Sequence, residues 1–200
     1  IFNGEAVFSK GFELAGEHLL NVGVEGRLKR VGWDYILGVK EEFHAAAFVQ
    51  DEWRPIEPLR LVASYRMDRH PLLDDGEPGL AHSPRLSAIY IPFEGHAFRV
   101  SGASAFREPT FLESYVHLLF PAAGVPGASA LTVGNEKLKP EQLVAFELGY
   151  RGEAPTLGID WDVALYQNTV TNLIGLSAFQ RLPAGETFHD ESGTFLVGRS

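Results

Sequence analysis

The chain has 200 residues, of which 45% are hydrophobic and 22% are charged, a composition typical of a folded protein and not of a disordered one. Its 17 Lys and Arg residues oppose 26 Asp and Glu residues, which gives a net charge of -9. Because no basic cluster stands out, nucleic acid is not expected as a partner. Cysteine is absent, so the chain offers no disulfide, no thiolate zinc site and no cysteine nucleophile.

Alternation of apolar and polar residues predicts four antiparallel hairpins. The last strand of the series is the clearest, since Trp161 and Val163 share one face while Asp160 and Asp162 share the other. The predicted fold class is therefore all-β. In chain order, the strand pairs are residues 5–14 with 19–28, 45–53 with 59–68, 86–91 with 98–106, and 143–150 with 159–168.

Short and long connections alternate between these strands. That asymmetry is typical of an antiparallel up-and-down transmembrane β-barrel, in which brief turns lie on the periplasmic side and long loops lie outside. Strand runs of about 8 to 11 residues also suit a tilted strand that crosses hydrocarbon. The short turns are residues 16–18, 54–58, 94–96 and 151–158, and the long connections are residues 29–43, 69–84 and 107–142.

A soluble all-β sandwich or lipocalin-like barrel, acting as a carbohydrate- or lipid-binding module, is the alternative interpretation, because its strands alternate too. The charged face formed by Asp160 and Asp162 argues against it, since a soluble barrel usually buries its inner face. Aromatic residues near strand ends suit a membrane interface, with packing in a core as their alternative role. These residues are Trp53, Tyr65, Tyr90, Tyr150 and Trp161.

The sequence carries no pattern of an enzyme or a metal centre. Its seven histidines include no helical pair at i and i+4 and no Cys/His cluster, and neither Ser104 nor Ser114 stands in a nucleophile elbow. We therefore expect no catalytic residue, no cofactor and no metal site. His70 and His82 bracket an acidic stretch that could touch a metal chelate, although a solvated loop is the preferred interpretation. Its acids are Asp74, Asp75 and Glu77.

Four motifs resemble the barrels of TonB-dependent outer-membrane receptors. Residues 106–115, FREPTFLESY, are similar to the family's Phe-Arg-x-Pro-x-x-x-Glu-x-Tyr. Residues 134–141, GNEKLKPE, followed by FELG at 146–149, are similar to its Gly-Asn-Pro-x-Leu-x-Pro-Glu and Glu-x-Gly, with Glu136 where the family has Pro. Residues 48–53, FVQDEW, and 83–86, SPRL, resemble two of its strand segments.

The resemblance implies about eight strands of a larger barrel of about 22, with residues 1–200 part of the barrel domain and no plug domain among them. It also implies the cell outer membrane of a Gram-negative bacterium and contact with outer-membrane lipid.

In function, the resemblance implies a receptor that captures a small molecule or metal chelate through its outer loops and takes it up with power from TonB, which acts through the plug domain. The ligand would be a ferric siderophore, cobalamin or a glycan. The residues that contact it are not identified. We expect the motif residues to be structural, and they are Phe106, Arg107, Pro109, Glu113, Gly134, Asn135, Leu138, Pro140, Glu141, Glu147 and Gly149.

Overall fold

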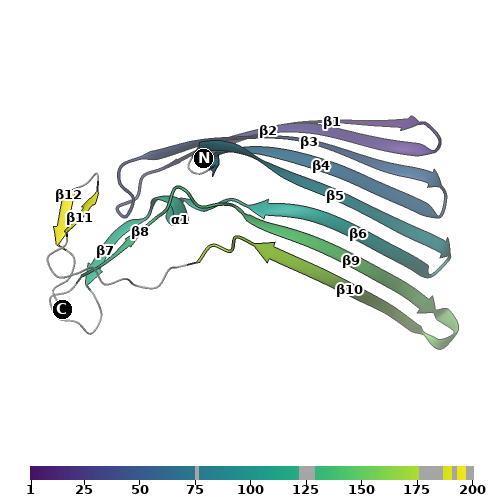
Figure 1. Cartoon of the computed structure of the whole chain (residues 1–200). Coiled ribbons are helices and arrows are strands. Elements are labelled where there is room, and N and C mark those ends of the chain that lie inside the picture. Colours follow the sequence, from purple (N-terminus) through teal and green to yellow (C-terminus); the bar gives the residue numbers. More distant parts are fainter. Residues whose placement is uncertain (75–76, 122–128, 176–186, 191–192, 197–200) are drawn as a thin grey trace.

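The computed structural model describes the chain except for residues 75–76, 122–128, 176–186, 191–192 and 197–200. Eight strands form one antiparallel sheet in the order β1-β2-β3-β4-β5-β6-β9-β10, and Figure 1 shows them side by side in a single curved sheet. The predicted all-β antiparallel architecture is therefore confirmed. The strands are β1 (Phe2–Glu13), β2 (Glu17–Val31), β3 (Lys40–Ile56), β4 (Leu59–Asp74), β5 (Glu77–Phe93), β6 (His96–Arg107), β9 (Glu141–Ala154) and β10 (Ile159–Thr171).

A short helix and two small hairpins accompany the sheet. Between β6 and β9 lie the helix α1 (Phe111–Tyr115) and the hairpin of β7 (His117–Pro121) and β8 (Ser129–Val133). A 3-10 turn, η1 (Pro155–Leu157), connects β9 to β10, and β11 (Thr187–Asp190) pairs with β12 (Gly193–Leu196). Within the described ranges, no helix is long and apolar enough to cross a membrane.

The predicted short turns are tight. Only Glu57 and Pro58 separate β3 from β4, and only Glu94 and Gly95 separate β5 from β6. Gly95 has a φ of 80°, a left-handed conformation that glycine adopts without a steric penalty. The short turns lie together at one end of the sheet, whereas α1, β7 and β8 lie at the other end (Figure 1).

Two of the predicted long connections are wrong, because the strands continue into them. β4 extends to Asp74 and β5 begins at Glu77, with His70 paired to Gly79 inside the expected loop. Likewise, only residues 32–39 separate β2 from β3. At the end of the sheet opposite the short turns, the strands carry polar residues, Pro and Gly on both faces. The alternation of apolar and polar residues that predicts a strand therefore disappears there. The connection predicted at 107–142 does hold α1, β7 and β8.

The sheet is a single layer, and the part of the chain that the structure describes contains hardly any hydrophobic core. Apart from Pro109 and a few glycines, the buried apolar residues there are Ile36, Leu72 and Ala81. One face of the sheet is nevertheless apolar: Val163 is paired with Tyr150, Tyr150 with Phe98, and all three side chains are exposed or half-buried. Such a continuous uncovered apolar face is unfavourable in water and suits contact with lipid.

Aromatic rings gather on the apolar face close to the short turns. Tyr150 stacks on Phe98 with ring centroids 4.7 Å apart, and Trp161 meets Tyr150 edge-on at 6.2 Å. A second group consists of His18 stacked against Trp53 at 5.6 Å. Amphipathic rings in such a band suit a membrane interface. Tyr65 is the exception among the predicted aromatic residues, since it lies away from the turns and stacks on His82.

Candidate functional site

The second face of the sheet carries ion pairs that connect neighbouring strands. Near the short turns, Arg99 on β6 donates from Nε to Glu147 Oε1 on β9 at 2.9 Å. Its Nη1 and Nη2 atoms donate to the two carboxylate oxygens of Asp162 on β10 at 3.0 and 2.8 Å. A two-pronged contact of this kind fixes the orientation of both groups. Three strands are thereby linked on the polar face.

Gly149 makes this link sterically feasible. It is paired with Arg99 across β6 and β9 and is buried beneath that side chain. A Cβ atom at position 149 would collide with the Arg99 Nε, Cζ and Cγ atoms. The Glu-x-Gly motif therefore has a local explanation, because Glu147 accepts the hydrogen bond and Gly149 leaves room for its donor.

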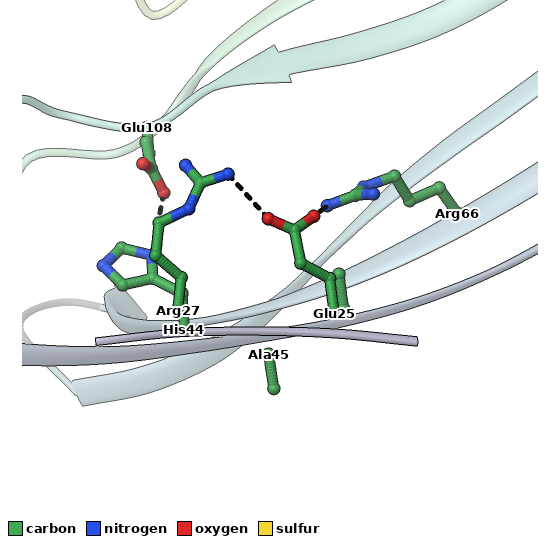
Figure 2. A pocket seen from close by; sticks show the side chains of 7 residues that line it. Glu25, Arg27, His44, Ala45, Arg66 and Glu108 are labelled. Atoms are coloured by element: carbon green, nitrogen blue, oxygen red, sulfur yellow. Dashed lines mark hydrogen bonds and ion pairs between the residues drawn. The ribbon is translucent and has the colours of Figure 1, made fainter. Parts of the chain in front are cut away.

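Farther from the turns, Glu25 on β2 lies between two arginines, as Figure 2 shows. Arg27 donates to Glu25 at 2.6 Å and Arg66 on β4 at 2.9 Å, while Arg66 also contacts Asp68 at 2.7 Å. A cavity of about 50 Å³ lies beside them, bounded also by His44 and other residues. That volume accommodates water but is far below the roughly 300 to 1,000 Å³ of small-molecule sites. The polar face of β2, β3 and β4 is therefore lined with paired charges, and we call this face the wall.

At the end opposite the short turns, the Glu108 carboxylate is contacted by side chains from three strands. Lys29 Nζ on β2 donates to Oε1 at 2.6 Å. His44 Nδ1 on β3 and His70 Nε2 on β4 lie 3.1 and 3.3 Å from Oε2. Burial by itself raises the pKa of Glu108, but hydrogen bonds from His44 and Lys29 outweigh that effect and lower the pKa to about 2. Glu108 is therefore an ionised hub at neutral pH.

A second carboxylate, the buried Glu42 on β3, completes this cluster. It lies 2.9 Å from His44 Nε2 and accepts a hydrogen bond from the hydroxyl of Tyr115. Burial and the Glu42 charge raise the pKa of Tyr115, so its hydroxyl keeps the proton that it donates. Because His44 faces a carboxylate at each ring nitrogen, it carries both protons and a positive charge.

The cluster was also tested against the chemistry of a metal centre. Ligand-type atoms of Glu42, His44 and His70 lie within 4.8 Å of one another. However, His70 Nδ1 accepts the Leu72 N–H at 3.0 Å, so the proton of the neutral imidazole is on Nε2. That nitrogen is buried, faces Glu108 and makes no hydrogen bond. Since neither ring offers a free lone pair, the arrangement fits an ion-pair network better than a cation site.

The first motif, residues 106–115, holds α1 against the end of the sheet. Arg107 at the end of β6 contacts Glu141 Oε2 at 2.7 Å and Glu113 Oε2 at 3.0 Å. Glu113 also accepts the Thr110 N–H at 2.7 Å, while the Thr110 hydroxyl accepts the Glu113 N–H at 3.3 Å. This reciprocal capping box begins the helix. The Arg107 guanidinium lowers the pKa of Glu113, so the charged contact persists.

The second motif, residues 134–141, contacts the same helix, α1, from the part of the chain that follows β8. Gly134 donates its N–H to Val116 O at 2.6 Å, and a Cβ atom there would strike the backbone of Ser114. Asn135 donates its N–H to Glu113 O at 2.9 Å. Pro140 O accepts from Asn172 Nδ2 at 3.3 Å. The remaining motif residues are the buried Pro109 and the half-buried Phe106 and Leu138.

The two histidines that bracket the predicted acidic stretch, His70 and His82, do not share a site. His70 is 1% exposed on the polar face, whereas His82 lies on the apolar face, where its Nδ1 is 2.6 Å from the Tyr65 hydroxyl. The strands continue through this region and successive side chains alternate between faces, so the two histidines diverge. Asp75 lies outside the described residues.

The sequence prediction missed the charged cluster around Glu108. In register, Lys29 lies opposite Glu42 and Arg27 lies opposite His44, and cross-strand partners of this kind stabilise a sheet. That signal is readable only when the pairing of β2 and β3 is known. Glu108 occupies the variable position of the Phe-Arg-x-Pro motif, which gave no reason to single it out.

Comparison with known proteins identifies relatives of this chain. The family described as TonB dependent receptor-like, beta-barrel, matches residues 35–189. The chain is 28% identical over 138 residues to the iron-regulated outer membrane virulence protein of Vibrio cholerae serotype O1, covering 66% of this chain and 20% of that protein. It is 30% identical over 116 residues to the vitamin B12 transporter BtuB of Vibrio vulnificus, covering 58% and 15%. The chain thus spans a fifth or less of these relatives.

Solved structures share its fold. The siderophore receptor PirA from Pseudomonas aeruginosa superimposes with a TM-score of 0.72 at 23% identity, covering 84% of this chain and 31% of the receptor. A mutant of the ferric enterobactin receptor PfeA from the same organism gives 0.68 at 19% identity, covering 84% and 26%. The predicted barrel segment is confirmed by this likeness, and the soluble sandwich alternative is wrong.

Proposed function

Because this chain belongs to the TonB-dependent receptor family and forms part of its β-barrel, we propose that it serves in a receptor that takes up a scarce ligand. The family is one of outer-membrane receptors of Gram-negative bacteria and not of enzymes. The observation that carries the proposal is the single-layer sheet with two unlike faces. Val163 and its neighbours face lipid, whereas Arg99, Glu25 and Glu108 face the interior of the barrel.

Among the ligand classes, we propose a ferric siderophore. PirA is named a siderophore receptor, PfeA a ferric enterobactin receptor, and the V. cholerae relative an iron-regulated protein. Cobalamin is the second candidate, supported by the likeness to a vitamin B12 transporter. The ligand would be captured at the end of the barrel that carries α1, β7 and β8, since the opposite end has only tight turns.

The proposed energy source is TonB, which would act through a plug domain separate from the barrel segment formed by residues 1–200. The ordered ion pairs on the interior face support this division of roles. Because the charges on the interior face are already paired with one another, that face is suited to enclosing a plug. Capture of the ligand would then fall to the outer links.

Uptake by the complete receptor in its own host tests the proposal. We expect deletion of its gene to abolish uptake of radiolabelled ferric enterobactin, and reintroduction of the gene to restore it. Inactivation of the inner-membrane energy complex should abolish it again. Loss of radiolabelled cobalamin uptake alone would reassign the ligand to the second candidate. Unchanged uptake of ferric enterobactin, cobalamin and a maltooligosaccharide would contradict the transport proposal.

A further inference from the structure

The segment that leads from β6 into the outer link is attached to the interior wall at two places. We name residues 107–117 the rim segment, and the contacts of Glu108 with Lys29, His44 and His70 the Glu108 clasp. We propose that Glu108 is a positioning residue, whose clasp fixes the rim segment against the barrel wall so that the outer link is held in one place for ligand capture. The capture part of this inference rests on the proposed function.

The clasp joins one carboxylate to three separate strands. Lys29, His44 and His70 come from β2, β3 and β4, whereas Glu108 follows β6. In the sheet, β5 separates β6 from β4, so Glu108 is not a cross-strand neighbour of any of these residues. The contacts therefore connect two separate parts of the sheet across the polar face, unlike ion pairs between adjacent strands.

The second attachment runs in the opposite direction, from the wall to the rim segment. Glu42 of the wall accepts the Tyr115 hydroxyl, and Lys40 Nζ lies 4.8 Å from the centre of the Tyr115 ring. Backbone contacts extend this attachment, since His117 donates its N–H to Tyr35 O at 2.7 Å and Val116 bridges to Ile36. The rim segment thus contributes one carboxylate, Glu108, to groups of the wall, and the wall contributes one carboxylate, Glu42, to the rim segment.

The charges of the cluster balance. Lys29 and His44 are positive, Glu108 and Glu42 are negative, and His70 is neutral because its Nδ1 accepts the Leu72 N–H. Removal of one member of a buried charge network leaves a partner uncompensated, which is strongly unfavourable. Lifting Glu108 from the wall would leave Lys29 without its partner and His44 with Glu42 alone, so the clasped arrangement is favoured.

The helix itself cannot explain the order of the rim segment. α1 has only five residues, and an isolated helix of fewer than about 12 residues is marginal in water. Its position must come from contacts outside the helix. Arg107 holds the segment at the end of β6, and Glu108 holds it on the wall.

Spin labelling of the complete receptor in lipid vesicles, without any ligand, tests the clasp. A single cysteine at Leu112, which is exposed on α1, carries the nitroxide. Glu108→Gln removes the charge while keeping the side-chain shape. Glu41→Gln is the matched control, since Glu41 is an exposed carboxylate beside Glu42 on the same strand and faces away from the cluster.

We expect the Leu112 label to become more mobile in Glu108→Gln and in Lys29→Gln. The double variant should be no more mobile than Glu108→Gln, because Glu108→Gln already removes the ion pair with Lys29. Because loss of the Glu108 charge leaves Lys29 unpaired, a lower unfolding midpoint is expected in either role. A second nitroxide at Val163 on β10, a strand without clasp residues, should keep its mobility, which separates a positioning role from a general structural one. An immobile label at Leu112 in Glu108→Gln, an equal response to Glu41→Gln, or an equal rise in mobility at Val163 would overturn the inference.

Zinc titration of the same receptor adds an independent readout. Tight stoichiometric Zn²⁺ binding that is lost in both His44→Gln and His70→Gln would make the cluster a metal centre and overturn the clasp. Absence of such binding supports it. Because none of these measurements uses a transport ligand, the clasp can fail while the uptake proposal stands, and the reverse also holds.

Discussion

Gly149 of β9 lies directly beneath the side chain of Arg99 of β6, which passes over it to reach Asp162 on β10. A guanidinium can bridge two strands that are not neighbours only when the strand between them presents no side chain at the crossing point. The Glu-x-Gly motif therefore encodes a cross-link over three strands, with Glu147 as the nearer acceptor.

Replacing Gly149 with alanine should weaken this cross-link. The added Cβ would occupy the space of Arg99, and forcing extra atoms into a filled site costs typically about 1 to 3 kcal/mol. Reversible unfolding of the receptor in lipid vesicles measures the effect. Gly26→Ala is the control, because a Cβ there meets only the Phe43 ring at 3.9 Å. Equal stability of the two variants would contradict the proposed role of Gly149.

The two faces of β10 should respond differently to a new charge. Val163 faces lipid two residues beyond Trp161 on β10, so Val163→Arg should cost unfolding free energy, up to the roughly 2 to 4 kcal/mol of a site at the bilayer midplane. Asp160→Arg on the interior face should cost far less. Asp162 is unsuited as the control, since its contact with Arg99 would be replaced by repulsion between like charges. Unfolding in vesicles of stated thickness compares them, and equal costs would reverse the assignment of faces.

The sequence predicted the parts of the fold that depend on lipid contact. Alternation around Val163 and Trp161 located β10 because one face meets hydrocarbon and the other meets polar groups. Beyond the lipid band that constraint ends, so the extension of β4 past Arg69 was not predictable. The Glu108 cluster was hidden for a different reason. Its members are neighbours only through strand register and through a link that folds back onto the wall, and neither is a local property of the chain.

Acid should release the rim segment. Glu108 lies outside the strands that cross the membrane, and its pKa falls from an ordinary 4.5 to about 2. A lowered pKa means that the ionised form stabilises the clasp above pH 4.5, and that this contribution is lost as the pH falls toward 2. The groups that face Glu108 are Lys29, His44 and His70.

The nitroxide at Leu112 measures this release. Its mobility should rise between neutral pH and about pH 3 in the native background. The Glu108→Gln background should be mobile throughout and respond less. Glu113 shares the direction of the shift, since Arg107 lowers its pKa too, so the difference between the two backgrounds is the quantity that reports Glu108. Identical acid responses in both would assign the release to Glu113.

Accessibility from outside the cell should separate the two ends of the sheet. Successive strands of an up-and-down barrel reverse direction, so all short turns share one side and all longer links share the other. Single cysteines at Asp34, between β2 and β3, and at Leu112 on α1 should react with an impermeant thiol reagent on intact cells. Cysteines at Glu57 and Glu94, in the two-residue turns, should not.

Disruption of the outer membrane should make Glu57 and Glu94 reactive, which shows that their protection comes from location and not from burial. These 200 residues contain no cysteine, and the unsubstituted receptor provides the background. Labelling at Glu57 with protection at Asp34 would invert the topology and move ligand capture to the periplasmic side. The outer position of α1 is what makes the Glu108 clasp relevant to capture, so an inverted pattern would leave the clasp intact as a contact while removing its proposed purpose.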